Sequence, residues 1–338
     1  MKVTMLGASR SGKTTYMAAM KTLFYDQPKE DFLLVANTNK RQSEELVYVH
    51  FDELSCLAEG RFPNATATDS TIMELTLTRG RSDVLDLSWV DYRGRAIEEL
   101  ARGSRTESTS RLETYLLSSD VIFVFADAEL LKTIDNVPLL ISKSGINSAP
   151  VVEMLNRIYS KNCPSIIFLL SKCDSDLVNI ANDYYLLRNR LNMAYARFFS
   201  NNRTSIERFS VIPIGCVGAG RVHTDTTNGN YIDRITRPGI VPINVDVSFA
   251  YALELCRKRE VAELDRTIRA QTAALDQIVF RYPILSKLVD TLFYGSRKQE
   301  QQWELQQMLG EKRLEKERLN VHKEALERIW SKGLQYVR

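Results

Sequence analysis

Short apolar runs alternate with helical patterns along the first two thirds of the chain. The runs Val121–Ala126, Ser165–Leu170 and Phe209–Ile214 are bounded by turn residues, which is typical of buried parallel strands. Crossover helices are expected between such strands, and the pattern therefore predicts an α/β fold with a doubly wound, mostly parallel sheet. The expected crossover helices are Thr109–Leu117, Val151–Tyr159 and Tyr184–Phe199.

The N-terminal part adds further strands to this sheet. Lys2–Leu6 is an apolar run that ends in a glycine-rich turn, and Lys13–Phe24 then has apolar residues at helical spacing. Phe32–Ala36 is a candidate second strand. The alternating runs Ile72–Leu77 and Val84–Val90 are separated by a short polar turn and predict an antiparallel hairpin.

The last third of the chain has a different character. Val217–Asn244 is glycine-rich and polar and reads as a surface loop, and a long helical pattern starts at Ser248. We therefore divide the chain into a domain at residues 1–255 and a C-terminal helical region at residues 256–338. A last charged helix is expected over Gln299–Trp330. The apolar stripe at Ile284–Phe293 has few basic neighbours, which favours packing or binding a protein partner over lying on a membrane.

Composition limits the functional classes. The chain has 338 residues, is 44% hydrophobic and carries a net charge of +3, and it has no dense basic stripe of the kind that nucleic-acid binding needs. No apolar run is long enough to span a membrane, and only six residues precede Gly7, so no signal peptide is expected. The five cysteines form neither a disulfide pattern nor a metal-binding spacing, which indicates a reducing compartment and a cytoplasmic protein.

The strongest motif is a phosphate-binding loop. The segment from Gly7 to Thr14 fits GxxxxGK[ST] and lies between a predicted strand and a predicted helix. Its backbone N–H groups can converge on phosphates, the Lys13 ammonium adds positive charge, and the Thr14 hydroxyl can bind Mg²⁺. The residues predicted to bind nucleotide here are Gly7, Ser9, Arg10, Ser11, Gly12, Lys13, Thr14 and Thr15.

A second motif follows the hairpin. Asp91-Tyr92-Arg93-Gly94 fits DxxG, in which the carboxylate contacts the Mg²⁺ shell and the glycine N–H contacts the terminal phosphate. Its position after the second strand of the hairpin is where P-loop proteins carry a magnesium-binding aspartate. We therefore predict that Asp91 binds the metal and that Gly94 takes part in catalysis.

A third motif predicts the base. Ser171-Lys172-Cys173-Asp174 directly follows an apolar strand and resembles the [NT]KxD motif of GTPases, with Ser171 in place of the usual asparagine or threonine. A carboxylate accepts hydrogen bonds from guanine N1 and N2 but would face the acceptor N1 of adenine, so Asp174 favours GTP over ATP. Lys172 would lie along the base. Cys216, after the next strand, is the predicted backbone contact to the guanine carbonyl.

Together, the three motifs resemble the translation-factor-related class of P-loop GTPases, whose Ras-like core carries them in this order. The resemblance covers roughly residues 1–255. The run from Gly60 to Thr66 is similar to switch I of bacterial double-GTPase-like families, which implies Thr66 as a catalytic and magnesium-binding threonine. Thr68 and Thr71 are alternatives for this role.

Arg10 extends the resemblance. The loop is similar to that of guanylate-binding and atlastin-type GTPases, in which an arginine at this position acts as an internal finger. This resemblance implies a catalytic role for Arg10 and a nucleotide-dependent homodimer. A solvated arginine is the alternative.

Arg95 stands where Ras-like proteins carry the glutamine that positions water, which predicts slow hydrolysis. The sequence therefore predicts a cytoplasmic, magnesium-dependent GTPase that converts GTP to GDP and phosphate and acts as a switch or assembly factor, with a protein partner at its helical tail. The alternative is a structural subunit that binds a nucleotide and hydrolyses little or none. An ATPase or kinase of the same fold is a third reading.

Overall fold

The computed structural model describes residues 1–37, 54–63, 70–92, 94–103, 106–142, 146–225, 232–237, 239–280 and 295–337. The chain forms two compact units, Met1–Ala252 together with Glu327–Arg338, and Leu253–Leu326. The domain boundary predicted between residues 255 and 256 stays a proposal. Two predictions lie outside the described residues: the threonines Thr66 and Thr68, and the apolar stripe at Ile284–Phe293.

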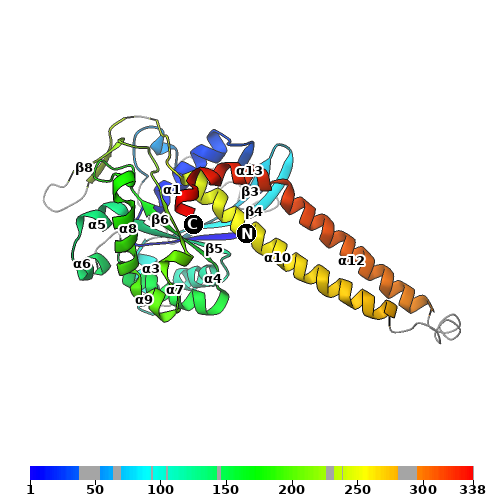
Figure 1. Cartoon of the computed structure of the whole chain (residues 1–338). Helices are drawn as coiled ribbons and strands as arrows, with labels where there is room; N and C mark the ends of the chain where they lie inside the picture. Colours follow the sequence, from blue (N-terminus) through cyan, green and yellow to red (C-terminus); the bar gives the residue numbers. More distant parts are fainter. Residues whose placement is uncertain are drawn as a thin grey trace. The chain divides into compact units, whose positions relative to one another are not determined.

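The first unit is built on a seven-stranded sheet, which confirms the predicted α/β class (Figure 1). The strand order is β2-β3-β4-β1-β5-β6-β7; β1 is parallel to β4 and β5, and β6 is parallel to β5 and β7. The predicted antiparallel hairpin is confirmed as β3–β4, and β2 pairs with β3 at the edge. The strands are β1 (Lys2–Leu6), β2 (Phe32–Ala36), β3 (Ser70–Arg79), β4 (Ser82–Tyr92), β5 (Val121–Asp127), β6 (Ser165–Ser171) and β7 (Ser210–Pro213).

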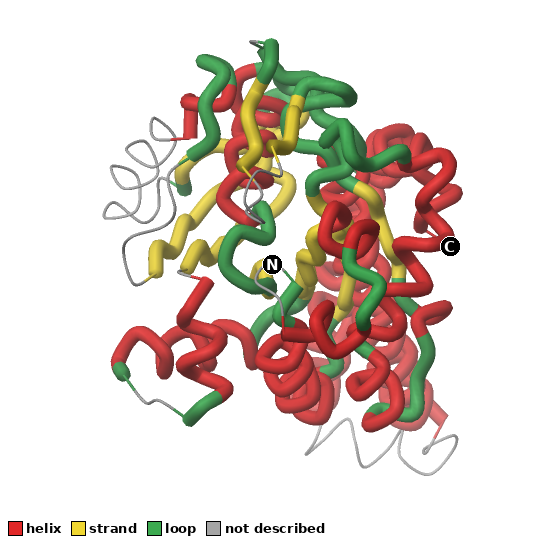
Figure 2. Tube along the Cα trace, turned by 90° about the vertical axis from the view of Figure 1, so that its left-hand side faces the viewer, coloured by secondary structure: helices red, strands yellow, loops and turns green. Residues whose placement is uncertain are grey.

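The parallel strands end at a common edge of the sheet. Thr4 pairs with Val90, Leu6 with Val124, and Asp127 with Ser171, so the segments after β1, β4, β5 and β6 leave the sheet on the same side. Figure 2 looks toward this side, where loops gather. Ligand sites of open α/β sheets form at this carboxyl edge.

Helices cover both faces of the sheet. The predicted helix Tyr184–Phe199 is broken at Tyr195, whose buried ring packs edge-on against Phe168 at a centroid distance of 5.2 Å. Two short helices, α5 and α6, were not predicted from the sequence. The helices are α1 (Lys13–Lys21), α3 (Gly94–Ala101), α4 (Glu107–Leu117), α5 (Ala128–Thr133), α6 (Val137–Ser142), α7 (Ser148–Asn162), α8 (Ile180–Ala194) and α9 (Ala196–Asn201). A π-helical turn (Thr22–Asp26) follows α1, and single 3₁₀ turns lie at Leu54–Leu57, Ile206–Arg208 and Ser331–Gly333.

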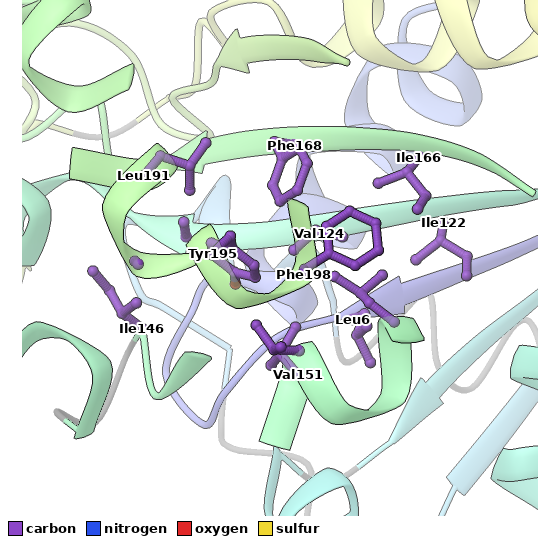
Figure 3. Close-up of a cluster of buried hydrophobic side chains, with 14 of the residues drawn as sticks. Leu6, Ile122, Val124, Ile146, Val151, Ile166, Phe168, Leu191, Tyr195 and Phe198 are labelled. Carbon is purple, nitrogen blue, oxygen red and sulfur yellow. The ribbon is translucent and has the colours of Figure 1, made fainter. Parts of the chain in front are cut away.

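The core explains why the strands read as continuous apolar runs. All seven residues of β5 are buried, because helices pack on both faces. Ile122 and Val124 face the layer of α7 and α9, where they join Val151 and Phe198 (Figure 3). On the other face, the ring of Tyr16 from α1 packs edge-on against Phe123 and Phe125.

The expected loop over Val217–Asn244 contains a two-stranded sheet, so that prediction was wrong for part of the segment. The antiparallel strands are β8 (Val222–Asp225) and β9 (Ile232–Ile235). In β8, Val222 and Thr224 are buried whereas His223 is exposed. Four residues are too short a run for the alternation to stand out against the polar and glycine-rich surroundings.

The second unit contains two antiparallel helices. The long helical patterns predicted helices here, but the single helix expected over Gln299–Trp330 is interrupted at His322. Asp265 Oδ1 accepts a hydrogen bond from Lys316 Nζ at 2.6 Å, and Asn320 Oδ1 accepts one from Arg257 at 2.6 Å. Within the described residues, no helix has both the length and the apolar character needed to cross a membrane. The helices of the C-terminal part are α10 (Val245–Phe280), α12 (Gly295–Val321), α13 (Lys323–Trp330) and α14 (Leu334–Val337).

Candidate nucleotide-binding site

The loop between β1 and α1 has a backbone that needs glycine at two positions. A Cβ atom on Gly7 would lie 2.7 Å from Ser11 Oγ and 3.0 Å from Phe125 Cβ, so a side chain there would collide with the loop and with β5. Gly12, which precedes α1, has φ 89°, a left-handed conformation that costs glycine little. Arg10 shares this conformation with φ 65° although it has a side chain.

The ammonium of Lys13 lies against this loop. Its Nζ donates hydrogen bonds to the carbonyl oxygens of Gly7 and Ala8, both at 2.9 Å. It also lies 5.3 Å from the centroid of the Tyr92 ring. Lys13 is only 6% exposed, so its positive charge is held at the inner side of the loop, next to the start of α1.

The other predicted loop residues differ in exposure. Ser11 is fully buried and Arg10 is exposed, while Ser9, Thr14 and Thr15 are half-buried. Thr14 and Thr15 belong to the first turn of α1, where the N–H groups have no acceptor within the helix. A helix start of this kind favours an anion.

The second motif lies next to the loop in the sheet. Asp91 follows Val90, which pairs with Thr4 of β1, so Asp91 and the phosphate loop lie at the same edge. Thr71 is the backbone partner of Asp91 across the hairpin, and Gly94 begins α3. The side chains of Asp91 and Thr71 are outside the described part of the structure.

The base-recognition motif lies against the phosphate loop. The Ser171 hydroxyl donates a hydrogen bond to Ala126 O at 3.2 Å, which ties the end of β6 to β5. A Cβ atom on Gly12 would lie 3.4 Å from Ser171 Cβ. The structure thus brings two motifs together that lie more than 150 residues apart in the sequence.

Asp174 is hydrogen-bonded to the loop that follows β7. Its Oδ2 accepts hydrogen bonds from Val217 N at 2.7 Å and Gly218 N at 3.2 Å, and the residue is 4% exposed. Burial raises the pKa of the Asp174 carboxyl, and the two N–H donors oppose this effect. A Cβ atom on Gly215 would lie 2.8 Å from Asp174 Cβ, so only glycine allows this approach. Cys216 is buried in the same loop.

Lys172 is surrounded by three acidic side chains that the sequence analysis did not select. Its Nζ lies 2.8 Å from Asp127 Oδ2, 3.1 Å from Asp233 Oδ2 and 3.7 Å from Glu129 Oε2. Burial lowers the pKa of Lys172, but the three carboxylates outweigh it and the net shift is upward. The position of Asp127 at the end of an apolar strand was the available signal, whereas no sequence pattern connects Asp233 to this site.

Comparison with known proteins agrees with these motifs. Residues 4–149, somewhat less than half of the chain, match the family model Double-GTPase 1. Among curated proteins, none matches the sequence. The matched segment contains the phosphate loop and the DxxG motif, whereas the base-recognition motif lies beyond it.

Two solved structures align with the chain. A dimerization-deficient mutant of Toc33 from Arabidopsis thaliana aligns at 10% identity over 64% of this chain and 71% of its own, with a TM-score of 0.35. Sup35 complexed with GDP aligns at 11% identity over 67% of this chain and 40% of its own, with a TM-score of 0.32. Because these scores are low, the assignment is based on the family match and the motifs: the chain contains a P-loop GTPase core that is similar to the Double-GTPase 1 family.

Proposed function

We propose that this protein binds GTP and GDP with Mg²⁺, hydrolyses GTP to GDP and phosphate slowly, and acts as a nucleotide-dependent switch or assembly factor. The observation that supports this best is the environment of Asp174. A buried carboxylate is oriented by two backbone N–H groups, and the motif that contains it lies against the phosphate loop. Phosphate and base recognition thus occur at one edge of the sheet.

The phosphates would be bound by the loop and the start of α1. Gly7, Ser9, Arg10, Ser11, Gly12, Thr14 and Thr15 supply backbone N–H groups or hydroxyls around this position. Lys13 would exchange its hydrogen bonds to the carbonyls of Gly7 and Ala8 for bonds to phosphate oxygens. This exchange should cost little free energy, because hydrogen bonds to charged phosphate oxygens are stronger than those to the two neutral carbonyl oxygens that they replace.

Mg²⁺ would be held by Thr14 and Asp91, with Thr66 or one of its alternatives as the switch ligand. The backbone fits this set, because Thr14 is in the first turn of α1 and Asp91 is the last residue but one of β4, the strand beside β1. Among the described residues, no group of three or more His, Cys, Asp or Glu side chains forms a metal site of its own. Mg²⁺ in nucleotide sites typically takes few protein ligands and completes its shell with phosphate and water, and it neutralises phosphate charge.

The base would be recognised by Asp174, Lys172 and the backbone at Cys216. The Asp174 carboxylate would accept from N1 and N2 of guanine, and the N–H groups of Val217 and Gly218 orient it and favour its ionised form. Adenine would place an acceptor against the same carboxylate, which is unfavourable. The aliphatic part of Lys172 would lie along the ring.

Hydrolysis would depend on Lys13, Arg10, Thr66 and the N–H of Gly94. Arg10 is exposed at the loop, so its guanidinium is available to a terminal phosphate or to a second copy of the chain. We therefore include a nucleotide-dependent homodimer in the proposal, together with a protein partner at the helical tail and a cytoplasmic location. Arg95 in place of a water-positioning glutamine keeps the rate low.

Calorimetry with GTP, GDP and ATP in the presence of Mg²⁺ tests the proposal. GTP and GDP should bind more tightly than ATP, and Asp174→Ala should abolish the preference. Asp83, an exposed aspartate at the start of β4, gives the matched control Asp83→Ala, which should bind like the wild type. Preferential binding of ATP would refute the guanine assignment and favour the ATPase or kinase reading.

A structural subunit is the second candidate, and Arg95 is the residue that favours it. Such a subunit would bind GTP and release no phosphate. Phosphate release that Lys13→Ala abolishes would establish the enzyme, and binding without release would establish the subunit.

A further inference from the structure

We propose that the β8–β9 hairpin is a specificity element of the nucleotide site, in which Asp233 positions the base-recognition lysine, Lys172. This inference depends on the proposed function, because Lys172 matters only if the site takes a guanine base. Asp233 acts through Lys172 and is therefore a positioning residue.

The carboxylates around Lys172 come from three different elements. Asp127 ends β5, Glu129 is in the first turn of α5, and Asp233 belongs to β9. Asp127 is 2% exposed and its Oδ1 accepts from Leu130 N at 3.1 Å, so it is a fixed anchor. Asp233 is half-buried, and its Oδ2 forms the ion pair between the hairpin and Lys172 Nζ at 3.1 Å.

The hairpin is also joined to the segment that contains Asp174. Asp176 N donates to Val222 O at 3.0 Å, and Thr224 N donates to Asp176 Oδ1 at 3.2 Å. The Ser175 and Thr224 hydroxyls lie 3.1 Å apart. Backbone and side-chain hydrogen bonds therefore hold the hairpin directly beside the base-recognition motif. A substitution in the hairpin can thus alter the position of Lys172 without altering the phosphate loop.

The position of the Thr224 hydroxyl indicates which of the neighbouring carboxyl groups is protonated. Thr224 Oγ1 lies 2.5 Å from Glu129 Oε1 and 3.0 Å from Asp233 Oδ1. One hydroxyl has a single hydrogen and cannot donate to two carboxylates. If Glu129 is protonated, its O–H donates to Thr224, and Thr224 donates to Asp233. Glu129 Oε1 then donates, Thr224 Oγ1 both accepts and donates, and Asp233 Oδ1 accepts.

The charge balance supports the same protonation. With Glu129 neutral, Lys172 is balanced against two carboxylates, Asp127 and Asp233, instead of three. Burial raises the pKa of Glu129 and proximity to Asp127 raises it further; Lys172 and the hydroxyls of Ser175 and Thr224 oppose this, but the net shift of the pKa is upward. Glu129 is 1% exposed, and its Oε2 lies 3.7 Å from Lys172 Nζ but has no hydrogen-bond partner, so ionisation would leave a poorly solvated charge.

The first experiment measures the affinities of GDP and inorganic triphosphate by calorimetry. Asp233→Asn keeps the shape but removes the charge, and it should weaken GDP binding about fivefold, since one half-buried charged contact of roughly 1 kcal/mol is lost. Binding of triphosphate should be unchanged, because it needs only the phosphate loop. Arg234→Gln, the exposed neighbour on β9, is the control and should alter neither affinity.

The second experiment follows GDP affinity against pH. As pH rises through the raised pKa of Glu129, the network loses its proton, three carboxylates face one ammonium, and affinity should fall. Glu129→Gln supplies an amide donor to Thr224 and should flatten this dependence. His223 and Asp176 form a neighbouring titratable pair at 2.5 Å, so His223→Gln is measured in parallel and should keep the wild-type profile over this range.

The outcomes separate this inference from the proposed function. If the wild type binds no guanine nucleotide, the proposed function fails and this inference fails with it. If the wild type binds GDP but Asp233→Asn matches it, the hairpin has no role in the base site and only this inference is overturned. If Asp233→Asn weakens GDP and triphosphate equally, the effect is general and the inference is also overturned. Restoration of GDP affinity by Asp233→Glu would support it.

Discussion

The phosphate end and the base end of the candidate site are built in different ways. The phosphate end is one continuous loop, in which Gly7, Gly12 and Lys13 lie within seven residues of each other. The base end joins β6, the loop after β7, and the β8–β9 hairpin through buried and half-buried charged side chains. Local backbone geometry determines the first, and contacts across large sequence separations determine the second.

This difference indicates how each end responds to change. At the phosphate end, the first turn of α1 and the loop N–H groups supply the binding groups, so most side chains there tolerate substitution while Lys13 does not. At the base end, Gly215 lies close to Asp174, whose carboxylate accepts from Val217 N, while Lys172 is held by Asp127 and Asp233. Substitution there should alter specificity and stability together. The following predictions test this comparison.

Lys13→Ala should have the largest effect. The variant loses the ammonium that lies at the loop, and a missing charged donor at a phosphate costs about 10²-fold or more in binding or turnover. Triphosphate affinity and phosphate release, measured by calorimetry and a phosphate assay, should both fall to that extent. Lys161→Ala, at an exposed position in the last turn of α7, is the control. Wild-type turnover in Lys13→Ala would show that the loop is not the reaction site.

Arg10→Gly should affect hydrolysis and leave binding nearly unchanged. Glycine relieves the left-handed backbone at φ 65°, so the fold should be unharmed or slightly more stable. If the guanidinium acts as a finger, phosphate release should fall about 10²-fold while GDP affinity stays within about twofold. Equal turnover in both proteins would leave Arg10 as a solvated side chain and remove it from the catalytic residues.

Asp174→Asn should change the base that is preferred. The introduced asparagine can keep its side-chain oxygen on the N–H groups of Val217 and Gly218 and turn its amide donor toward the base. GDP affinity should fall about 10²-fold, because the charged acceptor for N1 and N2 is lost. Xanthosine diphosphate has a carbonyl oxygen in place of the N2 amino group and should bind the variant better than GDP does. A uniform loss for both nucleotides would contradict the role given to Asp174.

The same contrast explains what the sequence could predict. The phosphate-loop motif, the hairpin β3–β4 and the parallel strands follow from local patterns. The structure confirms the hairpin and the strands, and the family match covers the motif. Asp127, Glu129 and Asp233 were not selected, because no motif links them: their relation appears only when β5, α5 and β9 meet at Lys172. The short strands β8 and β9 were missed for the same reason, since their stability depends on contacts with the base motif and not on their own four-residue patterns.

Gly215→Ala should have a smaller effect than the loss of a charged group, but it should appear in two measurements. The added methyl group would lie 2.8 Å from Asp174 Cβ and 3.2 Å from Asp174 N, so the loop or the aspartate must move. Overpacking of this kind costs about 1–3 kcal/mol of unfolding free energy. Denaturant unfolding should show this loss, and GDP affinity should fall about tenfold because Asp174 is displaced.

Gly310→Ala is the matched glycine substitution and should have the smallest effect, with the opposite sign. Gly310 is an exposed residue inside α12, with no other atoms within 4 Å of an added Cβ, and alanine is favoured over glycine in a helix by about 0.8–1 kcal/mol. The variant should therefore be slightly more stable, with unchanged GDP affinity. Both variants add one methyl group. A loss of GDP affinity in Gly215→Ala alone would therefore show that the close approach of residue 215 to Asp174 is the cause, and not glycine replacement in general. Loss of affinity in both would mean that glycine replacement itself, and not the close approach to Asp174, lowers GDP affinity.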